Sequence, residues 1–525
     1  MDIIEKEKKK RTILYGLLVT VLVLIGVTYA YYRITKTQTN SNVIGTRTCL
    51  NTTLTEETSE IVLSDAFPIS DEDGLKQSPF TFTLTNNCDS YVKVTIALVS
   101  EYRTSTNTAY LKDNYVKSNL STKGTNDGSS VILSTLSLGE VDTNTEGYVL
   151  KTTGLKNKEA KSFDLRLWLD SETTNEQGLN KTWKGKIVVS VVAAEYVPTL
   201  SEAILANNEV KTPITTPGAA ISTADEALLA SAEDNNGTSY YFRGAVKNNY
   251  VEFANKCWRI VRVGGDGSVK LILHNDNTTK VANPCDAANN SASAAFARYS
   301  GETYKSAFNT NYNDNAYVGF KYGTVGASTY DATHANTNKS TILTNLETWY
   351  NNNLKAYESV IDDNVWCNDK TKVTDTTFNP WNMSNVNGLG YGTNVTYYGA
   401  TQRLVSTSGR AGGTGPSLKC NGELSKITSK VGLITADELA FTGYAYNLEN
   451  TTTYLQENAT DTYWWSLSPN PFNGFSAYVW RVFGGYGDFG SDDVVDTYGV
   501  RPSISLKPTT NATGNGTSDK PYKVI

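Results

Sequence analysis

The stretch CWRIVRVGGDGSVKLILH, residues Cys257–His274, predicts a β-hairpin and decides the fold class of the second half of the chain. Two apolar runs flank Gly264–Gly267, and glycine supplies the backbone geometry that a tight turn between strands requires. From Ser239 onward the pattern becomes α+β, and this hairpin is its first clear element.

Helical patterns and a further strand follow the hairpin. Between Thr341 and Leu354, four apolar residues share one helical face. They are Ile342, Leu346, Trp349 and Tyr350. Thr435 and Glu438 form a capping box, which predicts a second helix start in LITADELAFTG. The segment GVRPSISLKP is typical of a strand, so we predict an α+β domain over residues 236–525.

The first half of the chain has the period-2 pattern of half-buried strands. In SPFTFTLTNN, Phe80, Phe82 and Leu84 alternate with polar residues. YVKVTIALV, SFDLRLWLD and WKGKIVVSVV repeat the pattern between turn-rich segments. We therefore predict an all-β antiparallel sandwich over 35–195. Residues 196–235, with TPITTPG and a short helical stretch LSEAILA, are predicted as a linker.

The N-terminus indicates a membrane segment. The basic MDIIEKEKKKRT precedes an apolar run from Ile13 to Tyr32, and about twenty helical residues span the roughly 30 Å hydrocarbon core. Basic residues prefer the cytoplasmic side. We therefore expect residues 1–34 to form a cytoplasmic tail and a transmembrane or signal segment, with a single pass and an extracellular C-terminus. Thr28 and Ala30 also suit signal-peptidase cleavage, so retention and cleavage both stay open.

The composition and the number of cysteines agree with an extracellular location. The net charge of −6 is spread over 525 residues without a basic domain, which argues against a nucleic-acid partner. Six cysteines suit an oxidising compartment, although sequence alone cannot choose among their pairings. If bridges stay within domains, the expected pairs are Cys49–Cys88, Cys257–Cys285 and Cys367–Cys420.

The segment from Tyr463 to Pro502 has the composition of a binding surface. It holds eleven aromatic residues up to Tyr498, set among Gly, Ser, Asn and Asp. Large rings give contact area at low entropic cost, and small polar residues adapt their hydrogen bonds. The candidate ligand-binding residues, each in or beside a loop-like stretch, are Asn470, Phe472, Asn473, Phe475, Tyr478, Arg481, Phe483, Tyr486, Asp488, Phe489, Ser491, Asp492 and Asp493.

Burial in the core is the alternative for each ring. Trp464, Trp465 and Trp480 lie in strand-like runs and are expected to be core residues. Four rings are flanked by Gly and Asn and are expected to be exposed. They are Phe472, Phe475, Tyr486 and Phe489. In AYVWRVF, alternation separates Trp480 from Arg481, and Arg481 suggests that its own face is wet.

Residues 13–195 resemble the camelysin and TasA group of Gram-positive surface proteins, through the GVTYAYY ending of the apolar run and the FTLTNN strand. Some members of that group were described as metalloproteases, and others build extracellular fibres. The resemblance therefore implies self-assembly through the β-sandwich as one option. Protease chemistry is not supported, because His274 and His334 lie outside this region and no H-E-x-x-H motif is present.

The second half resembles a surface-domain family with the C-type-lectin-like fold of formylglycine-generating-enzyme-like domains. The motifs are YYFRGAVKNNYVEFANKCWRIVRV, VWCND, PSLKC, GLITADELAF, YWWSLSP and GVRPSISLKP, in the expected order. The resemblance implies a framework around a ligand-facing surface. Its matching residues are Trp464, Trp465, Gly499, Val500, Arg501 and Pro502.

Some proteins of that fold carry loops that diversity-generating retroelements rewrite by mutating adenines. Such a variable protein cannot readily acquire Lys, Glu, Gln or Met from an Asn codon. None of these four residues occurs from Ser466 through Leu506. Diversification and chance both explain this absence, so both stay open.

Enzyme chemistry has little support in the sequence. No cysteine follows Cys420, whereas formylglycine-generating enzymes need reactive cysteines, and no His accompanies the aspartates of the aromatic stretch. These aspartates lack EF-hand spacing, and solvated loop carboxylates are preferred to a calcium site. We assign no catalytic residue, metal or cofactor.

The sequence thus predicts a cell-surface adhesin or receptor that binds an extracellular protein or glycan without turnover. The alternative is a structural, fibre-forming surface protein without a specific ligand. An oxidase or hydrolase is the third and least favoured class.

Overall fold

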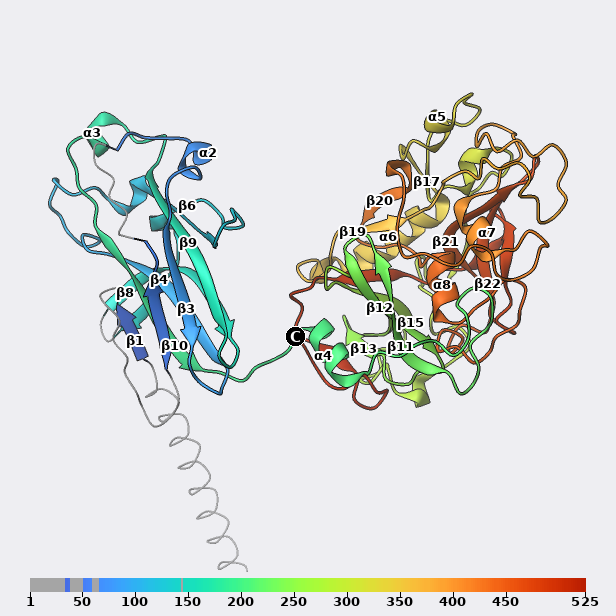
Figure 1. Cartoon of the computed structure of the whole chain (residues 1–525), viewed down its shortest axis with the longest axis horizontal. Helices are drawn as coiled ribbons and strands as arrows, with labels where there is room; N and C mark the ends of the chain where they lie inside the picture. Colours follow the sequence, from blue (N-terminus) through green and yellow to red (C-terminus); the bar gives the residue numbers. More distant parts are fainter. Residues whose placement is uncertain (1–33, 38–50, 59–65, 143–144) are drawn as a thin grey trace, which may run out of the picture. The chain divides into compact units, whose positions relative to one another are not determined.

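The computed structural model describes residues 34–37, 51–58, 66–142 and 145–525, and the protein is mostly β, with several sheets and few helices. The chain divides into two compact units at Tyr196 and Val197 (Figure 1). The predicted membrane segment Ile13–Tyr32 and Cys49 lie outside the described residues. Within the described ranges, no helix is long and apolar enough to cross a membrane.

The first unit contains two five-stranded antiparallel sheets. In sheet order, the first consists of β1 (Ile34–Thr37), β10 (Gly185–Ala193), β4 (Val92–Ser100), β8 (Thr145–Leu155) and β7 (Leu138–Asp142). The second consists of β2 (Thr52–Glu56), β3 (Phe80–Asn86), β9 (Ala160–Leu169), β5 (Val116–Thr122) and β6 (Val131–Ile132). Two short helices, α2 (Asp71–Gly74) and α3 (Asn175–Gly178), connect strands.

Both sheets of the first unit contribute to one apolar core. Phe80, Phe82 and Leu84 of β3 are buried in it together with Val94 and Val189 from the other sheet. Because successive side chains of a strand point to opposite faces, the period-2 pattern placed these three residues on one face. The four strands predicted from SPFTFTLTNN, YVKVTIALV, SFDLRLWLD and WKGKIVVSVV are confirmed as β3, β4, β9 and β10.

The second unit is built on an eight-stranded sheet. Its strands are β11 (Ala227–Asp234), β12 (Gly237–Gly244), β13 (Tyr250–Phe253), β14 (Lys256–Val263), β15 (Val269–Asn275), β25 (Ser503–Leu506), β26 (Ala512–Thr513) and β27 (Tyr522–Val524). The predicted hairpin is confirmed as β14 and β15, which pair antiparallel around Gly267 at a φ of 82°. The predicted final strand is confirmed as β25, which pairs with β15.

A second, five-stranded sheet has the order β16 (Lys305–Ala307), β24 (Thr497–Gly499), β21 (Tyr463–Phe472), β22 (Ala477–Phe483) and β23 (Phe489–Asp493). Two small ladders pair β17 (Lys321–Tyr322) with β18 (Asn338–Lys339) and β19 (Asn364–Cys367) with β20 (Lys426–Ser429). The helices of this unit are α4 (Leu200–Asn207), α5 (Tyr330–His334), α6 (Thr341–Asn353), α7 (Gly399–Leu404) and α8 (Ala436–Thr442).

Both predicted helices of the second unit are confirmed. The apolar face of α6 is buried, and Trp349 is fully covered. Thr435 and Glu438 form the predicted capping box at the start of α8, and the Thr435 hydroxyl accepts a hydrogen bond from the Glu438 amide. Such caps satisfy amide groups that a helix leaves unpaired at its first turn.

Residues 196–235 differ from the predicted linker. Leu200 and Ile204 of α4 are buried in the core of the second unit, and β11 pairs along its whole length with β12. The linker was predicted from the Pro, Thr and Gly residues of this segment. Leu228 and Leu229 are nevertheless buried, and they make β11 part of the sheet.

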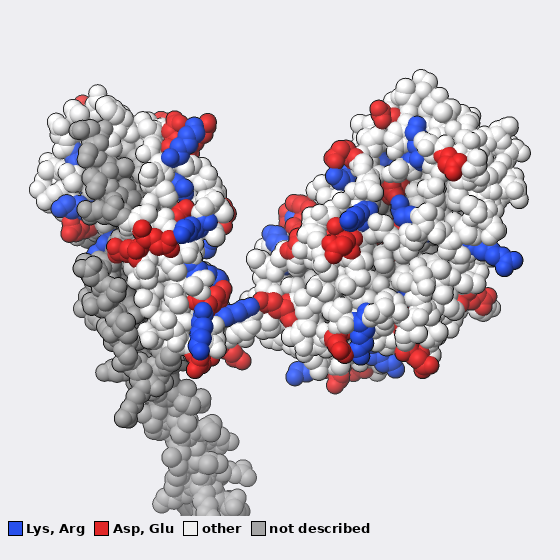
Figure 2. Space-filling view, viewed as in Figure 1, with Lys and Arg blue, Asp and Glu red and all other residues white. Residues whose placement is uncertain are grey.

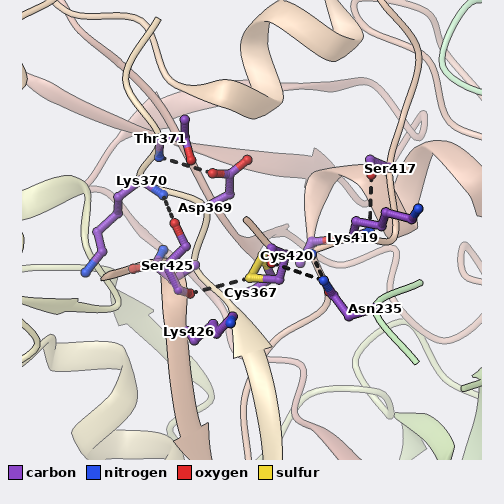
Figure 3. Close-up of a disulfide and its surroundings, with 12 residues drawn as sticks. Asn235, Cys367, Asp369, Lys370, Thr371, Ser417, Lys419, Cys420, Ser425 and Lys426 are labelled. Carbon is purple, nitrogen blue, oxygen red and sulfur yellow. Dashed lines mark hydrogen bonds between the residues drawn. A yellow bond between two sulfur atoms is a disulfide. The ribbon is translucent and has the colours of Figure 1, made fainter. Parts of the chain in front are cut away.

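Two of the expected disulfides are present, Cys257–Cys285 and Cys367–Cys420. The first ties β14 to the excursion that follows β15. The second ties β19 to the segment ahead of β20 (Figure 3). The predicted Cys49–Cys88 pair involves a residue outside the described part of the chain.

Candidate functional site

The aromatic stretch forms the antiparallel strands β21, β22 and β23, which include the strand-like runs around Trp464 and Trp480 and also part of the stretch expected to be loop. Tyr463 pairs with Phe483, Trp465 with Arg481, and Arg481 in turn with Gly490. Paired residues of neighbouring strands point to the same side of a sheet. This register therefore separates a face that carries Arg481 from a face that carries Trp480.

The Trp480 face is a core face. Trp464, Trp480, Val482 and Phe489 have no exposed surface, and the rings of Trp480 and Phe489 lie 4.7 Å apart. The predicted core position of Trp464, Trp465 and Trp480 is confirmed, and Trp465, which pairs with Arg481, is buried on the other face of the sheet. The predicted exposure of Phe489 is wrong, because its strand position turns the ring inward despite its flanking Asp and Gly.

Two further candidates are buried. Phe472 ends β21 inside the core, and the Asn470 side chain accepts a hydrogen bond from the Thr401 hydroxyl of α7 at 2.7 Å. The predicted exposure of Phe472 is therefore wrong, and Asn470 is unsuited to direct ligand contact. Both belong to the buried remainder of β21, from Trp464 to Phe472.

The opposite side of the sheet is partly open. We call it the Arg481 face, and it comprises Tyr463, Arg481, Phe483, Tyr486, Asp488, Asp492, Asp496 and Tyr498. Its rings form a row: Tyr463 stacks against Phe483 at 4.3 Å and against Tyr498 at 4.8 Å, and Phe483 meets Tyr486 at 5.3 Å. The row therefore crosses from β24 to the turn beyond β22.

Arg481 holds the Arg481 face together. Its Nη1 donates to Asp488 Oδ2 at 2.6 Å, its Nε donates to Asp492 Oδ2 at 2.9 Å, and its guanidinium lies over the Tyr463 ring. Burial alone would lower the pKa of Arg481, but the contacts with Asp488 and Asp492 raise it. Since the side chain is only 12% exposed, these partners fix its position.

Carboxylates border the rings at the end of the face near β24. The Tyr498 hydroxyl donates to Asp492 Oδ2 at 3.0 Å and to Asp496 Oδ2 at 3.2 Å. Burial and then the negative charges of Asp492 and Asp496 raise the pKa of Tyr498. Burial raises the pKa of Asp496, and its neighbours Asp492 and Asp493 raise it further. At this border Asp492 and Asp496 therefore share one hydroxyl donor, and their negative charges lie close together.

Two rings project from the turns at either end of β22. Phe475 is 82% exposed at the β21–β22 turn, where Asn473 Oδ1 accepts hydrogen bonds from the amides of Phe475 and Ser476. Tyr486 is 59% exposed at the β22–β23 turn. The predicted exposure of Phe475 and Tyr486 is confirmed.

The β22–β23 turn depends on glycine. Gly487 has a φ of 68°, in the left-handed region, and a Cβ there would lie 2.0 Å from the Asn450 carbonyl oxygen. Only glycine fits this position. The exposed position of Tyr486 therefore depends on Gly487, because any side chain at that position would disrupt the turn.

The remaining candidates, Tyr478, Ser491 and Asp493, are partly exposed on β22 and β23. Burial raises the pKa of Tyr478, and Asp493 and Asp492 contribute through their charge. The pairing of Tyr478 with Asp493 and of Trp480 with Ser491 places these three residues on the Trp480 side of the sheet, opposite the Arg481 face.

The framework residues hold the sheet on the rest of the unit. Trp464 pairs with Gly499, and the Trp465 indole donates to the Ser306 carbonyl at 2.9 Å. Arg501 is buried, and its guanidinium donates to the carbonyls of Leu273 and Leu455. Val500 and Pro502 are buried on either side of Arg501. These contacts make the sheet a rigid support.

Three residues of the Arg481 face were not among the candidates. Tyr463 and Tyr498 lie at the two ends of the aromatic stretch, and Asp496 lies beside Tyr498. The alternation of β21 and β22 could have placed Tyr463 beside Phe483 once their register was known. The parallel pairing of β24 with β21, which brings Tyr498 to Tyr463, has no local signal in the sequence.

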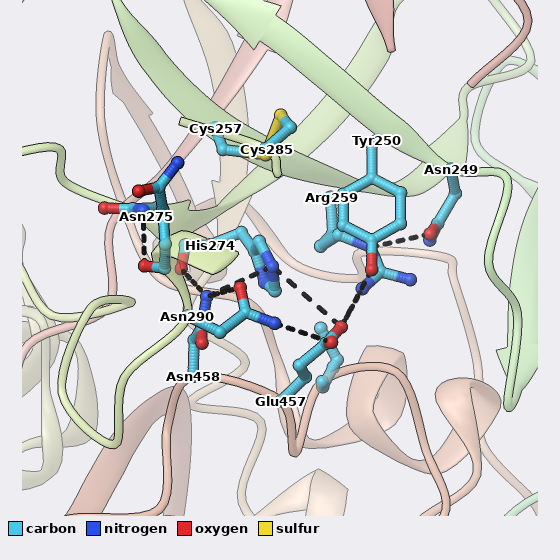
Figure 4. A network of polar contacts seen from close by, with 12 residues as sticks. Asn249, Tyr250, Cys257, Arg259, His274, Asn275, Cys285, Asn290, Glu457 and Asn458 are labelled. Carbon is cyan, nitrogen blue, oxygen red and sulfur yellow. Dashed lines mark hydrogen bonds and ion pairs between the residues drawn. A yellow bond between two sulfur atoms is a disulfide. The ribbon is translucent and has the colours of Figure 1, made fainter. Parts of the chain in front are cut away.

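The two histidines belong to buried hydrogen-bond networks. Glu457 accepts hydrogen bonds from Tyr250 and Arg259, while His274 contacts Asn458 (Figure 4). Burial, followed by the charge of Arg259, lowers the pKa of His274 well below its ordinary value. His334 is also buried, and its pKa falls to about 3. Both rings are therefore neutral structural elements at neutral pH.

A polar concavity of about 220 Å³ lies beside the first of these networks. Asn275, Asn289 and Arg298 are among its lining residues. Their side chains already donate to backbone carbonyls of the same excursion, including Pro284, Asn283 and Ser293. These side chains order the turns that form the concavity, so we favour the Arg481 face as the site.

Figure 2 shows charged side chains scattered over the visible face of each unit, without a continuous basic patch. In the described part of the chain, no three His, Cys, Asp or Glu side chains are grouped so that they could hold a metal ion.

Comparison with known proteins gives no assignment: no protein-family model matches the chain, and no curated protein matches it.

Proposed function

We propose that this protein is a cell-surface adhesin or receptor that binds an extracellular ligand through the Arg481 face and the projecting rings of Phe475 and Tyr486. The observation that carries the proposal is the exposure of these two rings at the turns of a rigid sheet. Large exposed rings are costly to leave in water, and aromatic residues are enriched in protein-binding surfaces. The proposed mechanism is binding without turnover.

The physical properties of the face suit recognition. Arg481 is held by two carboxylates, so the rings it contacts lose little further freedom when a ligand binds. Asp488 and Asp492 remain partly exposed and offer hydrogen-bond acceptors around the rings. Aromatic anchors surrounded by adaptable polar groups are the usual composition of a protein-binding surface.

We further propose that the second unit is a C-type-lectin-like scaffold and that the first is a β-sandwich stalk. The order of the sequence motifs supports the scaffold, and the shared core of two antiparallel sheets supports the stalk. The two disulfides support an extracellular location, which the apolar run Ile13–Tyr32 would provide by anchoring or export.

Binding of the purified full chain to glycan and surface-protein arrays tests the proposal. The Phe475→Ala and Tyr486→Ala variants should lose the signals that the wild type gives. Phe67→Ala is the matched control, because Phe67 is also a highly exposed ring but lies in the first unit. Signals that survive both site variants unchanged would contradict the proposed face.

A further inference from the structure

The turn between β21 and β22 contains an Asn–Gly pair, Asn473 and Gly474, directly ahead of the exposed ring of Phe475. An asparagine before a glycine can react with its own backbone, because bonding the glycine nitrogen to the side-chain carbonyl carbon closes a five-membered ring. Glycine carries no Cβ that would hinder this approach. The reactivity of such a pair therefore depends on how the fold holds the glycine amide and the asparagine carbonyl.

The fold favours the reaction at both groups of this pair. Asn473 Oδ1 accepts hydrogen bonds from the amide of Phe475 at 2.9 Å and from the amide of Ser476 at 2.8 Å. The amide of Gly474 donates to no group in the described part of the chain, and both residues of the pair are partly exposed to water. Two donors at a carbonyl oxygen stabilise the negative charge that develops there when a nucleophile attacks the carbon.

The other Asn–Gly pairs of the chain lack this combination. They are Asn236–Gly237, Asn387–Gly388, Asn421–Gly422 and Asn515–Gly516. The amides of Gly388 and Gly516 each donate to a backbone carbonyl at 3.1 Å, and Gly237 is held in the ladder of β11 and β12. The pair at Asn421 is exposed, but among the residues that the structure describes no amide donates to the Asn421 side chain.

We propose that Asn473 is a self-modification site, at which the folded turn promotes deamidation of this asparagine to aspartate and isoaspartate. The Gly474 nitrogen loses its proton to hydroxide and bonds to Asn473 Cγ, while the negative charge collects on Oδ1. The bond from Cγ to Nδ2 then breaks, ammonia leaves with a proton from water, and a succinimide ring remains. Addition of water to either ring carbonyl yields aspartate or isoaspartate. The first step is intramolecular, so its rate depends on how the turn orients the two groups.

The isoaspartate product changes the turn that presents Phe475. In isoaspartate the backbone runs through Cβ and Cγ, so the side-chain carbonyl of Asn473 becomes a peptide carbonyl and the turn gains a backbone atom. The side-chain acceptor that bonds the Phe475 and Ser476 amides is thereby lost. The modification itself is independent of the proposed function. Its consequence rests on that function, since ligand binding through Phe475 should decline as isoaspartate accumulates.

Incubation of the purified full chain at mildly alkaline pH, followed by digestion in acid and peptide mass spectrometry, tests the proposal. Asn473 should gain the mass of a carboxyl in place of an amide several-fold faster than Asn387 and Asn515, with isoaspartate among its products. In urea the fold no longer distinguishes the pairs, so all Asn–Gly sites should react at similar rates. Asn473→Gln, whose side chain would have to close a larger ring, should lose the mass change at this turn and leave Asn421 unaffected.

Asn421 supplies the matched comparison within the same chain, because its pair is exposed but no amide in the described residues donates to its side chain. The proposal is overturned if Asn473 reacts no faster than Asn421 in the folded chain, or if its peptide stays unmodified. Conversion of Asn473 with unchanged binding of an array ligand would instead contradict the proposed role of Phe475. Mass spectrometry detects the modification without any ligand, so the two failures are distinguishable.

Discussion

The guanidinium of Arg481 lies 4.7 Å from the centre of the Tyr463 ring, although eighteen positions separate the two residues in the chain (481 − 463). The same guanidinium bonds Asp488 and Asp492, so one side chain joins β21, β22 and β23. A bidentate cation over an aromatic ring is a more directional contact than an ammonium can provide. Arg481 is therefore predicted to stabilise the face on which the proposed function depends.

Replacement of Arg481 by lysine tests this role. Arg481→Lys keeps the charge but cannot bond Asp488 and Asp492 while covering Tyr463. Since hydrogen bonds to charged groups contribute about 1.5–3 kcal/mol, we expect the free energy of unfolding to fall by about that amount. Urea denaturation measures the change, with Arg410→Lys as an exposed control. Equal stability of both variants would show that the Arg481 contacts are dispensable.

The burial of the aromatic residues predicts effects of very different size for the same substitution at two positions. Phe489→Ala empties a core position and should lower the free energy of unfolding by about 3–5 kcal/mol. Phe475→Ala removes a ring that is 82% exposed and should change it by less than about 0.5 kcal/mol. Denaturation of both variants checks this contrast, and a large loss in Phe475→Ala would place that ring in a packed environment.

The same contrast shows what the sequence could and could not predict. Phe80, Phe82 and Leu84 alternate within one strand, so their shared face follows from local geometry. Phe475 and Phe489 both stand among Gly, Asn, Ser and Asp, so their composition looks alike. Phe489 is buried because Trp480 and Tyr444 pack on it from other segments. Local composition does not encode those distant contacts.

The site itself depends on register, which the sequence left undetermined. The β21–β22 pairing shifts between Trp465 and Pro469, so alternation cannot be extended along the whole strand. The parallel contact of Trp464 with Gly499 then brings Tyr498 to Tyr463. The alternation of Trp480 and Arg481 was readable, and Arg481 correctly marked the wetter face. The partners of Arg481, by contrast, could not be predicted from the sequence.

The two disulfides should contribute strongly to stability. They join residues separated by 28 and 53 positions, and loop-closure entropy then gives about 3.6 and about 4.2 kcal/mol. We expect Cys367→Ser/Cys420→Ser to lose at least as much stability as Cys257→Ser/Cys285→Ser. Urea denaturation of both variants without reductant measures this. A reductant should lower the wild type toward the variants, and indifference to reductant would argue against these bridges in solution.

The buried histidines predict a loss of stability in acid. Burial, then the charge of Lys370, lowers the pKa of His334 from 6.5 to about 3. The unfolded chain therefore takes up the proton first, so stability falls as the pH falls from 6.5 toward about 3. His334→Gln should lose less stability than the wild type over this range. Denaturation midpoints measured across the range decide the matter, and parallel curves would contradict a neutral buried His334.

Sequencing of the codons for Asn470 to Tyr498 across many cells of one culture tests whether the stretch is diversified. If a retroelement rewrites it, substitutions should occur at adenines and alter partly or fully exposed positions. Candidate positions are Phe475, Tyr478, Tyr486, Ser491, Asp492 and Asp493. Phe489 should remain unchanged because its ring fills a core position. Gly487 should remain unchanged because its backbone conformation excludes a side chain.

The pattern of substitutions then distinguishes diversification from ordinary drift. Changes confined to adenines, with silent flanking codons, would support a diversified surface whose ligand differs between cells. A uniform sequence would remove that hypothesis and leave a single fixed specificity. Frequent change at Asn470, whose buried side chain bonds Thr401, would contradict the structural account, since a cell that lost this contact would display a weakened scaffold.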